Sequence, residues 1–416
     1  MGTVSKDLNE TVHRIAFKEI NSGPPSKQYQ SDPLLARLKE LGTELWIDTG
    51  DLELAQSIWK NELTALTTNN TLANQVVQSG VMDAVIQETV DKLKEAASGL
   101  SREELVMEIG FVINCRIALR LVEAFKVKVS VELHPSISRD IEKSVEYGKR
   151  YFAVCPEYFT VKVPLTPEGL LTTRRIRQEN IPVNFTLGFS ARQNYLAARL
   201  SNPNYVNVFL GRLNAVVADN SAGSGEWVGE KVTLHTQSAL EEVRNNHPDV
   251  ETRLIAASIR NGDQVATLAG MDVHTIPPKA MKEFQDSGRT PDQIHKTDGT
   301  ALNPDMKSEH DWSARVAHLW EVDGDFRKAV DRLMARGDLD QMSGDDLVRF
   351  CEDSGLDLFH PFTGQDLNKI QDDGKIPKLA NWPGSIALDD LMTQSALQSF
   401  AKDQNALDAR IQSFLK

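Results

Sequence analysis

Short segments in which apolar and polar residues alternate recur along the chain between residues 44 and 276. Eight of them are predicted to be strands: ELWID (Glu44–Asp48), ALTTN (Ala65–Asn69), VKVSVE (Val127–Glu132), TVKV (Thr160–Val163), PVNFT (Pro182–Thr186), YVNVF (Tyr205–Phe209), TRLIAAS (Thr252–Ser258) and VHTI (Val273–Ile276). Longer segments with helical periodicity separate them, such as the amphipathic run that follows Ser101 and Glu104, a capping-box pair, and ends at Phe125. This alternation is typical of a parallel sheet with helical crossover connections.

Eight strand and helix units within roughly 250 residues match the size of a closed (β/α)8 TIM barrel. We therefore predict an α/β fold in which residues 1–290 form the barrel and an N-terminal arm. Residues 291–416 are predicted to form a mostly helical C-terminal extension that packs on the barrel. An open doubly wound sheet is the alternative, although no GxGxxG turn follows the first predicted strand.

The two faces of each predicted strand differ in polarity, because side chains two positions apart point to the same side. In residues 127–132 the valines share one face, and Lys128, Ser130 and Glu132 share the other. A barrel packs its apolar face outward against the helices, so the polar face points inward and its last residue lies at the carboxyl-terminal rim. Seven residues are therefore expected to converge on one mouth: Asp48, Asn69, Glu132, Lys162, Thr186, Phe209 and Ser258. A half-solvated antiparallel strand would show the same alternation.

Lys162 lies between two valines in the fourth predicted strand, where burial of a charged ammonium is costly. Desolvation disfavours the charged form, which favours a neutral amine able to attack a carbonyl group. The position therefore predicts covalent amine catalysis. An ion pair with Glu132 or Asp48 is the alternative interpretation.

Composition and charge argue against a nucleic-acid-binding, membrane-spanning or secreted protein. The net charge of −13 argues against a nucleic-acid partner, because phosphate backbones are bound by basic surfaces. No apolar run is long enough to span a bilayer, and the N-terminal residues MGTVSKDLNE lack the pattern of a secretory leader. Cys115, Cys155 and Cys351 are widely spaced without a CxxC pair, which indicates free thiols and a cytoplasmic location.

Seven segments resemble the transaldolase family, class I Schiff-base enzymes on a (β/α)8 barrel. They are WIDTGD (Trp46–Asp51), LTTNN (Leu66–Asn70), VSVE (Val129–Glu132), VKVPLTPEG (Val161–Gly169), IPVNFTLGFS (Ile181–Ser190), VFLGR (Val208–Arg212) and AASIRN (Ala256–Asn261). Their order and spacing agree with the family, and the segment that starts at Ala387 resembles its closing helix. The resemblance implies transfer of a dihydroxyacetone unit from fructose 6-phosphate or sedoheptulose 7-phosphate to erythrose 4-phosphate or glyceraldehyde 3-phosphate, in the pentose phosphate pathway.

The resemblance also implies the catalytic residues. Lys162 corresponds to the lysine that forms the Schiff base with the ketose phosphate. Asp48 corresponds to the carboxylate that takes the proton from the C4 hydroxyl as the C3–C4 bond breaks. Glu132 and Thr186 correspond to the pair that holds a catalytic water. This chemistry uses no cofactor and no metal.

Substrate-binding residues follow from the same resemblance. Asn69 and Asn184 correspond to amides that hold the retained three-carbon unit without adding charge. Arg212, Ser258 and Arg260 correspond to the phosphate site, where two guanidinium groups and a hydroxyl bind a dianion. Surface ion pairing is the alternative role for the arginines.

Departures from the family pattern leave other functions open. Asn207 stands where the family has a small serine that contacts substrate, and Asn70 replaces a proline. Phe209 stands where aldolase relatives carry a tyrosine, which favours transfer over release of dihydroxyacetone. The alternatives are a fructose-6-phosphate-type class I aldolase and a non-catalytic barrel that binds a sugar phosphate. The sequence is also compatible with a homodimer.

The stretch from about Gly288 to Pro383 is longer than the common transaldolase core. Its acidic clusters, at residues 323–325 and 344–346, do not have the spacing of a calcium-binding EF-hand loop. We expect them to lie at the capped ends of acidic surface helices.

Overall fold

Eight short parallel strands pair in the order in which they occur along the chain, and the last returns to pair with the first. They are β1 (Glu44–Asp48), β2 (Leu63–Thr67), β3 (Lys128–Glu132), β4 (Phe159–Pro164), β5 (Val183–Thr186), β6 (Tyr205–Phe209), β7 (Arg253–Ala257) and β8 (Val273–Ile276). This computed structural model describes residues 6–415 except 22, 24, 26, 97 and 98. Residues 1–5 of the predicted N-terminal arm lie outside the described residues. They are half of MGTVSKDLNE, the segment in which no secretory leader pattern was found.

The closed ring confirms the predicted TIM barrel and excludes the open doubly wound sheet. Seven predicted strands agree with the observed ones to within one residue at either end. The second prediction was wrong in its boundaries: β2 covers Leu63–Thr67 rather than Ala65–Asn69. Asn69 instead caps the following helix, because its side-chain oxygen accepts a hydrogen bond from the amide of Leu72.

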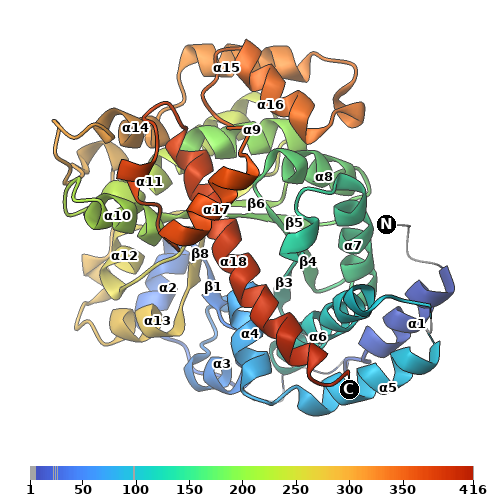
Figure 1. Cartoon of the computed structure of the whole chain (residues 1–416). Coiled ribbons are helices and arrows are strands. Elements are labelled where there is room, and N and C mark those ends of the chain that lie inside the picture. Colours follow the sequence, from blue (N-terminus) through green and yellow to red (C-terminus); the bar gives the residue numbers. More distant parts are fainter. Residues whose placement is uncertain (1–5, 22, 24, 26, 97–98, 416) are drawn as a thin grey trace.

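Helices surround the ring and connect its strands (Figure 1). They are α1 (Lys6–Ala16), α2 (Pro33–Glu40), α3 (Leu52–Ile58), α4 (Asn70–Gln78), α5 (Asp83–Ala96), α6 (Arg102–Phe125), α7 (Ile141–Val154), α8 (Pro167–Gln178), α9 (Ala191–Ser201), α10 (Leu210–Asp219), α11 (Val228–Asn246), α12 (Gly262–Thr267) and α13 (Pro278–Gln285). The predicted capping box of Ser101 and Glu104 starts α6, and Thr166 caps α8 with Pro167 in its first turn.

The C-terminal extension is mainly helical, as predicted. It contains α14 (Ser313–Ala317), α15 (Gly324–Met334), α16 (Gly344–Asp353), α17 (Gly364–Asp373) and α18 (Leu388–Gln412). Among the described residues, short 3-10 turns complete the secondary structure: η1 (Pro135–Ile137), η2 (Pro291–Gln293), η3 (Gly299–Ala301), η4 (His318–Trp320), η5 (Leu339–Gln341) and η6 (Leu379–Asn381). The acidic clusters cap helices as expected, because Asp323 caps α15 and Ser343 forms a capping box with Asp346 at α16.

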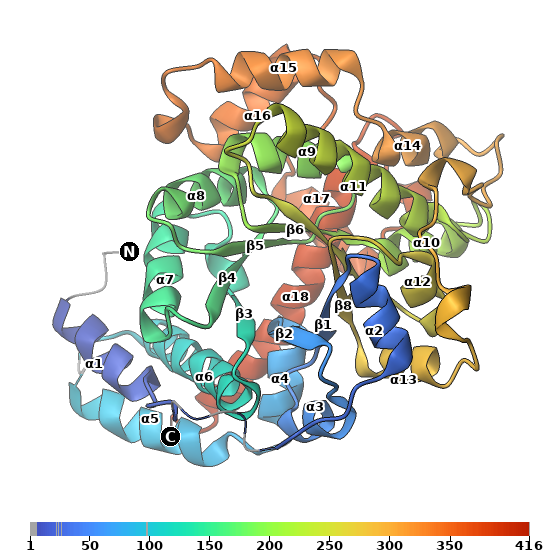
Figure 2. The ribbon, with the colours of Figure 1, turned by 180° about the vertical axis from the view of Figure 1, so that it is seen from behind.

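Helix α18 lies across one end of the barrel, in front of the strands in Figure 1 and behind them in Figure 2. Buried hydrophobic side chains of the barrel and the extension form one continuous cluster, which reaches from Val12 to Ile411. The extension therefore shares the hydrophobic core of the barrel. None of the described helices is both long and apolar enough to cross a membrane.

Candidate active site

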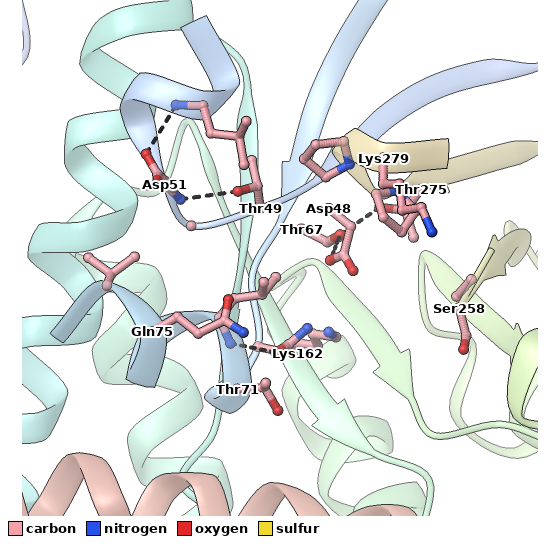
Figure 3. A pocket seen from close by; sticks show the side chains of 18 of the residues that line it. Asp48, Thr49, Asp51, Thr67, Thr71, Gln75, Lys162, Ser258, Thr275 and Lys279 are labelled. Carbon is pink, nitrogen blue, oxygen red and sulfur yellow. Dashed lines mark hydrogen bonds between the residues drawn. The ribbon is translucent and has the colours of Figure 1, made fainter. Parts of the chain in front are cut away.

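A cavity of about 690 Å³ opens at the carboxyl-terminal ends of the strands. It brings together most of the residues that the sequence predicted for the site: Asp48, Asn69, Lys162, Asn184, Asn207, Phe209, Arg212, Ser258 and Arg260. Figure 3 shows Asp48, Lys162 and Ser258 facing this space from different strand ends. The other two predicted residues, Glu132 and Thr186, are buried and do not line it.

Lys162 projects from β4, and only 4% of its surface is exposed. Its Nζ donates a hydrogen bond to the carbonyl oxygen of Thr68 at 3.0 Å and lies 3.4 Å from Oε2 of Glu132. Glu132 reaches this place because it pairs directly with Lys162 in the β3–β4 ladder, so both side chains point to the barrel interior. The amine therefore has one neutral acceptor and one carboxylate beside it.

The carboxyl group of Glu132 titrates close to neutral pH. Burial raises its pKa to about 7; the ammonium of Lys162 lowers it, and the charge of Asp48 raises it. Among the described residues, Oε2 of Glu132 has only its ion pair with Lys162, and Oγ1 of Thr186 has no hydrogen-bond partner. Since buried polar atoms are normally hydrogen-bonded, both atoms can bind a small polar molecule.

Asp48 ends β1 and is half-buried. Burial raises its pKa, while Lys162 and the Thr67 hydroxyl oppose the shift. Thr67 Oγ1 donates a hydrogen bond to Asp48 Oδ1 at 2.7 Å and lies 2.5 Å from Thr275 Oγ1 (Figure 3). Sequence analysis missed both threonines, although both lie within predicted strands. Thr67 could have been found, because it lies two positions before Asn69 and so shares a face of the predicted strand with it.

The two predicted substrate amides keep complementary groups free. Asn69 uses its oxygen to cap α4 at 2.9 Å, which leaves its NH₂ group for the cavity. Asn184 donates from Nδ2 to the hydroxyl of Ser130 at 3.1 Å, and its Oδ1 has no partner among the described residues. One amide is thus placed to donate and the other to accept.

Asn207 forms side-chain hydrogen bonds between β6 and the backbone of β5 and the loop that follows β5. Strands β5 and β6 pair at a single position, Asn184 with Tyr205. Beyond it, Asn207 Nδ2 donates to the carbonyl oxygen of Phe185 at 2.5 Å, and Asn207 Oδ1 accepts from the amide of Gly188 at 3.2 Å. The amide therefore adds two side-chain hydrogen bonds to the backbone bond from the amide of Phe209 to the carbonyl oxygen of Gly188, a role for which a serine is too short.

Phe209 follows at the end of β6 and presents its ring to the cavity. The residue is 8% exposed, and its ring meets that of Phe189 edge to face, with 5.8 Å between centroids. This position offers an apolar surface and no proton donor.

Arg212 and Arg260 form a cationic end of the cavity. Neither makes an ion pair with any residue that the structure describes, and the buried Nη1 of Arg212 has no hydrogen-bond partner there. Burial lowers the pKa of Arg212 to about 10, with a further contribution from the charge of Arg260. Two neighbouring cations that make no ion pair with the described residues form a site for an anion.

Backbone conformation brings Ser258 to the same place. In β7 the side chains of Ile255 and Ala257 line the cavity, so strict alternation would turn Ser258 away. Its φ of +61° lies in the left-handed region and redirects the side chain into the cavity. Gly211 permits this packing, because a Cβ there would lie 2.3 Å from the carbonyl oxygen of Ser258.

Comparison with known proteins identifies the family. The sequence profile described as transaldolase/fructose-6-phosphate aldolase matches residues 45–336. This chain belongs to the transaldolase/fructose-6-phosphate aldolase family. The matched region contains all eleven site residues that the sequence predicted, from Asp48 to Arg260.

Three relatives of this family member carry the name probable transaldolase. The protein of Exiguobacterium sibiricum is 39% identical over 153 residues, which are 36% of this chain and 62% of the relative, less than two thirds of its length. The protein of Parvibaculum lavamentivorans is 31% identical over 210 residues, 50% of this chain and 81% of that protein. The protein of Thermus thermophilus is 33% identical over 245 residues, 58% of this chain and 90% of that protein.

Two cavity residues of this family member lie outside the region that the profile matches. Lys375 follows α17, and Phe400 belongs to α18 with its ring centroid 5.8 Å from the guanidinium carbon of Arg212. The predicted closing helix contains Phe400, but its pattern gave no sign of this contact. Lys375 had no sequence signal, because its segment had no counterpart in the resemblance.

Among the described residues, no group of three or more histidine, cysteine, aspartate or glutamate side chains is arranged to hold a metal ion. The three cysteines are free and buried. The candidate site therefore consists of an amine, carboxylates, amides, hydroxyls and guanidinium groups.

Proposed function

We propose that this protein is a transaldolase that moves a dihydroxyacetone unit from a ketose phosphate to an aldose phosphate through a Schiff base on Lys162. One observation carries the proposal: a buried lysine beside a carboxyl group lines the same cavity as two arginines that make no ion pair with any described residue. Fructose 6-phosphate and sedoheptulose 7-phosphate are the proposed donors. Erythrose 4-phosphate and glyceraldehyde 3-phosphate are the proposed acceptors, in the pentose phosphate pathway of the cytoplasm.

Imine formation begins with the neutral amine of Lys162, which attacks the C2 carbonyl carbon of the donor. The carbonyl oxygen takes up protons and leaves as water. Glu132 suits this proton transfer, because a pKa of about 7 keeps both its protonated and ionised forms populated near neutral pH. The unpartnered hydroxyl of Thr186 supports the proposal that it and Glu132 hold the water involved.

Cleavage then requires a base at the C4 hydroxyl, and Asp48 takes this role. It accepts the hydroxyl proton as the C3–C4 bond breaks, so the product aldehyde leaves and the bonding electrons form an enamine with the imine carbon. Burial raises the pKa of Asp48, which makes its carboxylate a stronger base. The free NH₂ of Asn69 and the free oxygen of Asn184 suit the hydroxyls of the retained unit.

Transfer reverses these steps with a second aldehyde. The enamine carbon attacks the acceptor carbonyl, the new oxygen takes its proton from Asp48, and water hydrolyses the imine to release the product from Lys162. Arg212, Arg260 and Ser258 bind the phosphate of the donor and then that of the acceptor.

An aldolase on the same barrel would protonate the enamine and release dihydroxyacetone. Phe209 favours transfer, because a phenyl ring at the cavity wall has no proton to give. Intact Lys162, Asp48 and Glu132 argue against a non-catalytic binding barrel.

Borohydride reduction tests the Schiff base directly. Incubation with fructose 6-phosphate and sodium borohydride is expected to leave a reduced three-carbon adduct on Lys162, located by peptide mass spectrometry. Lys162→Met should abolish the adduct. Lys128→Met is the matched control, because Lys128 lies at the exposed start of the neighbouring strand and should not affect trapping. No adduct, or an adduct on another lysine, would refute the proposal.

A further inference from the structure

Lys375 places a cation of the extension beside the two arginines of the barrel. It follows α17 in a loop that begins with Gly374, and it lines the same cavity as Arg212 and Arg260. The family profile ends at residue 336, so this lysine belongs to a part of the chain that the family region does not include.

The loop that carries Lys375 is fixed in place at its start. Asp373 accepts hydrogen bonds from the side chains of Asn381 and Trp382, at 2.7 and 2.8 Å, and from the amide of Lys378 at 3.1 Å. These contacts keep the carboxylate of Asp373 occupied within the loop.

The same loop docks on the helix that carries Arg212. Asn220, the C-cap residue of α10, donates from Nδ2 to the carbonyl oxygen of Pro377 at 3.0 Å and accepts from the amide of Leu379 at 2.7 Å. Arg212 lies in the first turn of that helix. One rigid helix therefore positions both the arginine and the loop with the lysine.

Three cations meet here without an acid in ion-pair distance among the described residues. Lys375 is exposed on one side, and its partial burial lowers its pKa; the charges of Arg212 and Arg260 lower it further, whereas Asp403 of α18 opposes them. Asp403 already accepts a hydrogen bond from the hydroxyl of Thr71. Cations that repel one another are stabilised when a dianion binds between them.

We propose that Lys375 is a phosphate-binding residue supplied by the extension, and that it makes the enzyme selective for phosphorylated sugars. This inference rests on the proposed function, since it deepens the phosphate site of that reaction. Two guanidinium groups hold oxygens in fixed directions, while the flexible ammonium of Lys375 adds a third charge from the loop. The extension thereby takes part in substrate recognition without contact with the Schiff base.

Titration calorimetry with inorganic phosphate tests the site without any reaction. Lys375→Ala is expected to weaken phosphate binding about tenfold at low salt, and Lys375→Arg should restore most of it. Lys378→Ala is the matched control, because Lys378 is exposed in the same loop, as Lys375 is, but does not line the cavity. Equal binding by the wild type, Lys375→Ala and Lys378→Ala would overturn the inference, and so would a wild type that binds no phosphate.

Kinetics separate this inference from the proposed function. Lys375→Ala should raise KM for fructose 6-phosphate about tenfold with little change in kcat, and borohydride trapping with unphosphorylated dihydroxyacetone should equal that of the wild type. A structural role would instead lower Tm and reduce trapping with both substrates. If the wild type gave no borohydride adduct, the Schiff-base proposal would be refuted. The phosphate titration would still test the role of Lys375, because it needs no reaction.

Discussion

Glu132 and Lys162 occupy paired positions on neighbouring strands, and their charged ends lie 3.4 Å apart in the interior of the barrel. Each side chain is about 5% exposed, so neither charge is well solvated. The raised pKa of Glu132 is therefore expected to affect how both stability and activity respond to pH.

Glu132→Gln is expected to change the pH dependence of stability. Native Glu132 holds its proton up to about pH 7, whereas the unfolded chain loses it near 4.5. Between these values the native state binds more protons, so the contribution of this group to stability falls as pH rises. Glutamine cannot ionise, and the variant should therefore gain on the order of 3 kcal/mol relative to wild type between pH 5 and 8.

Urea denaturation of both proteins at several pH values measures this difference. Parallel stability curves for the two proteins across that range would show that the carboxyl group titrates normally. The same substitution should lower kcat by roughly a hundredfold, because a neutral amide cannot exchange the proton of imine formation.

Arg212→Ala or Arg260→Ala is expected to lower kcat/KM for phosphorylated substrates by roughly 2 to 4 kcal/mol, because a partly desolvated charged contact is lost. Steady-state assays with fructose 6-phosphate measure the effect. Arg289→Ala is a suitable control, since Arg289 pairs with Asp263 away from the cavity. Lys162 should still be trapped with dihydroxyacetone in all three variants. Normal use of sugar phosphates by both arginine variants would place the anion elsewhere.

Phe209→Tyr is expected to shift the fate of the enamine from transfer to release. A phenol at this position can donate a proton or order a water near the nucleophilic carbon. The variant should release more dihydroxyacetone from fructose 6-phosphate and transfer less to erythrose 4-phosphate, as a paired assay of both products would show. If the wild type releases dihydroxyacetone as fast as it transfers it, the aldolase alternative is correct.

Asn207→Ser tests the link between β5 and β6. Serine cannot span to both Phe185 and Gly188, so two buried backbone groups lose their partner, at a cost of about 1 to 3 kcal/mol. Thermal denaturation should show a lower Tm, and kcat should fall because Thr186 lies between the two lost contacts. Asn405→Ser, at an exposed position on α18, should change neither value. An unaltered Tm in Asn207→Ser would mean that the strands hold together without this amide.

Alternation along the chain was sufficient to predict the barrel and the strand that carries Lys162. Inward and outward positions in a parallel barrel differ in polarity, and this pattern survives in VKVSVE and YVNVF. The end of β2 was harder to predict, because Asn69 can extend a strand or cap a helix and only the fold decides. The side chain of Ser258 points into the cavity because its backbone is in the left-handed conformation, which the local sequence does not predict.

Long-range contacts account for the other residues that sequence analysis missed. The role of Asn207 depends on its contacts with Phe185 and Gly188 of a neighbouring segment, which no pattern within β6 encodes. Lys375 reaches the cavity only because its loop docks on Asn220, far away in the chain. Such contacts are set by tertiary packing, so a single sequence gives no periodic signal for them.

The β5–β6 ladder, with its single paired position, is the shortest in the barrel, and we expect the ring to open there most easily. Local opening begins where the fewest backbone hydrogen bonds must break, so amides beside this joint should exchange their hydrogens sooner than those of β3 and β4. The ladders from β3 to β4 and from β4 to β5 each extend over four positions. Local opening between β5 and β6 is therefore expected to leave Lys162 and Glu132 at their paired positions.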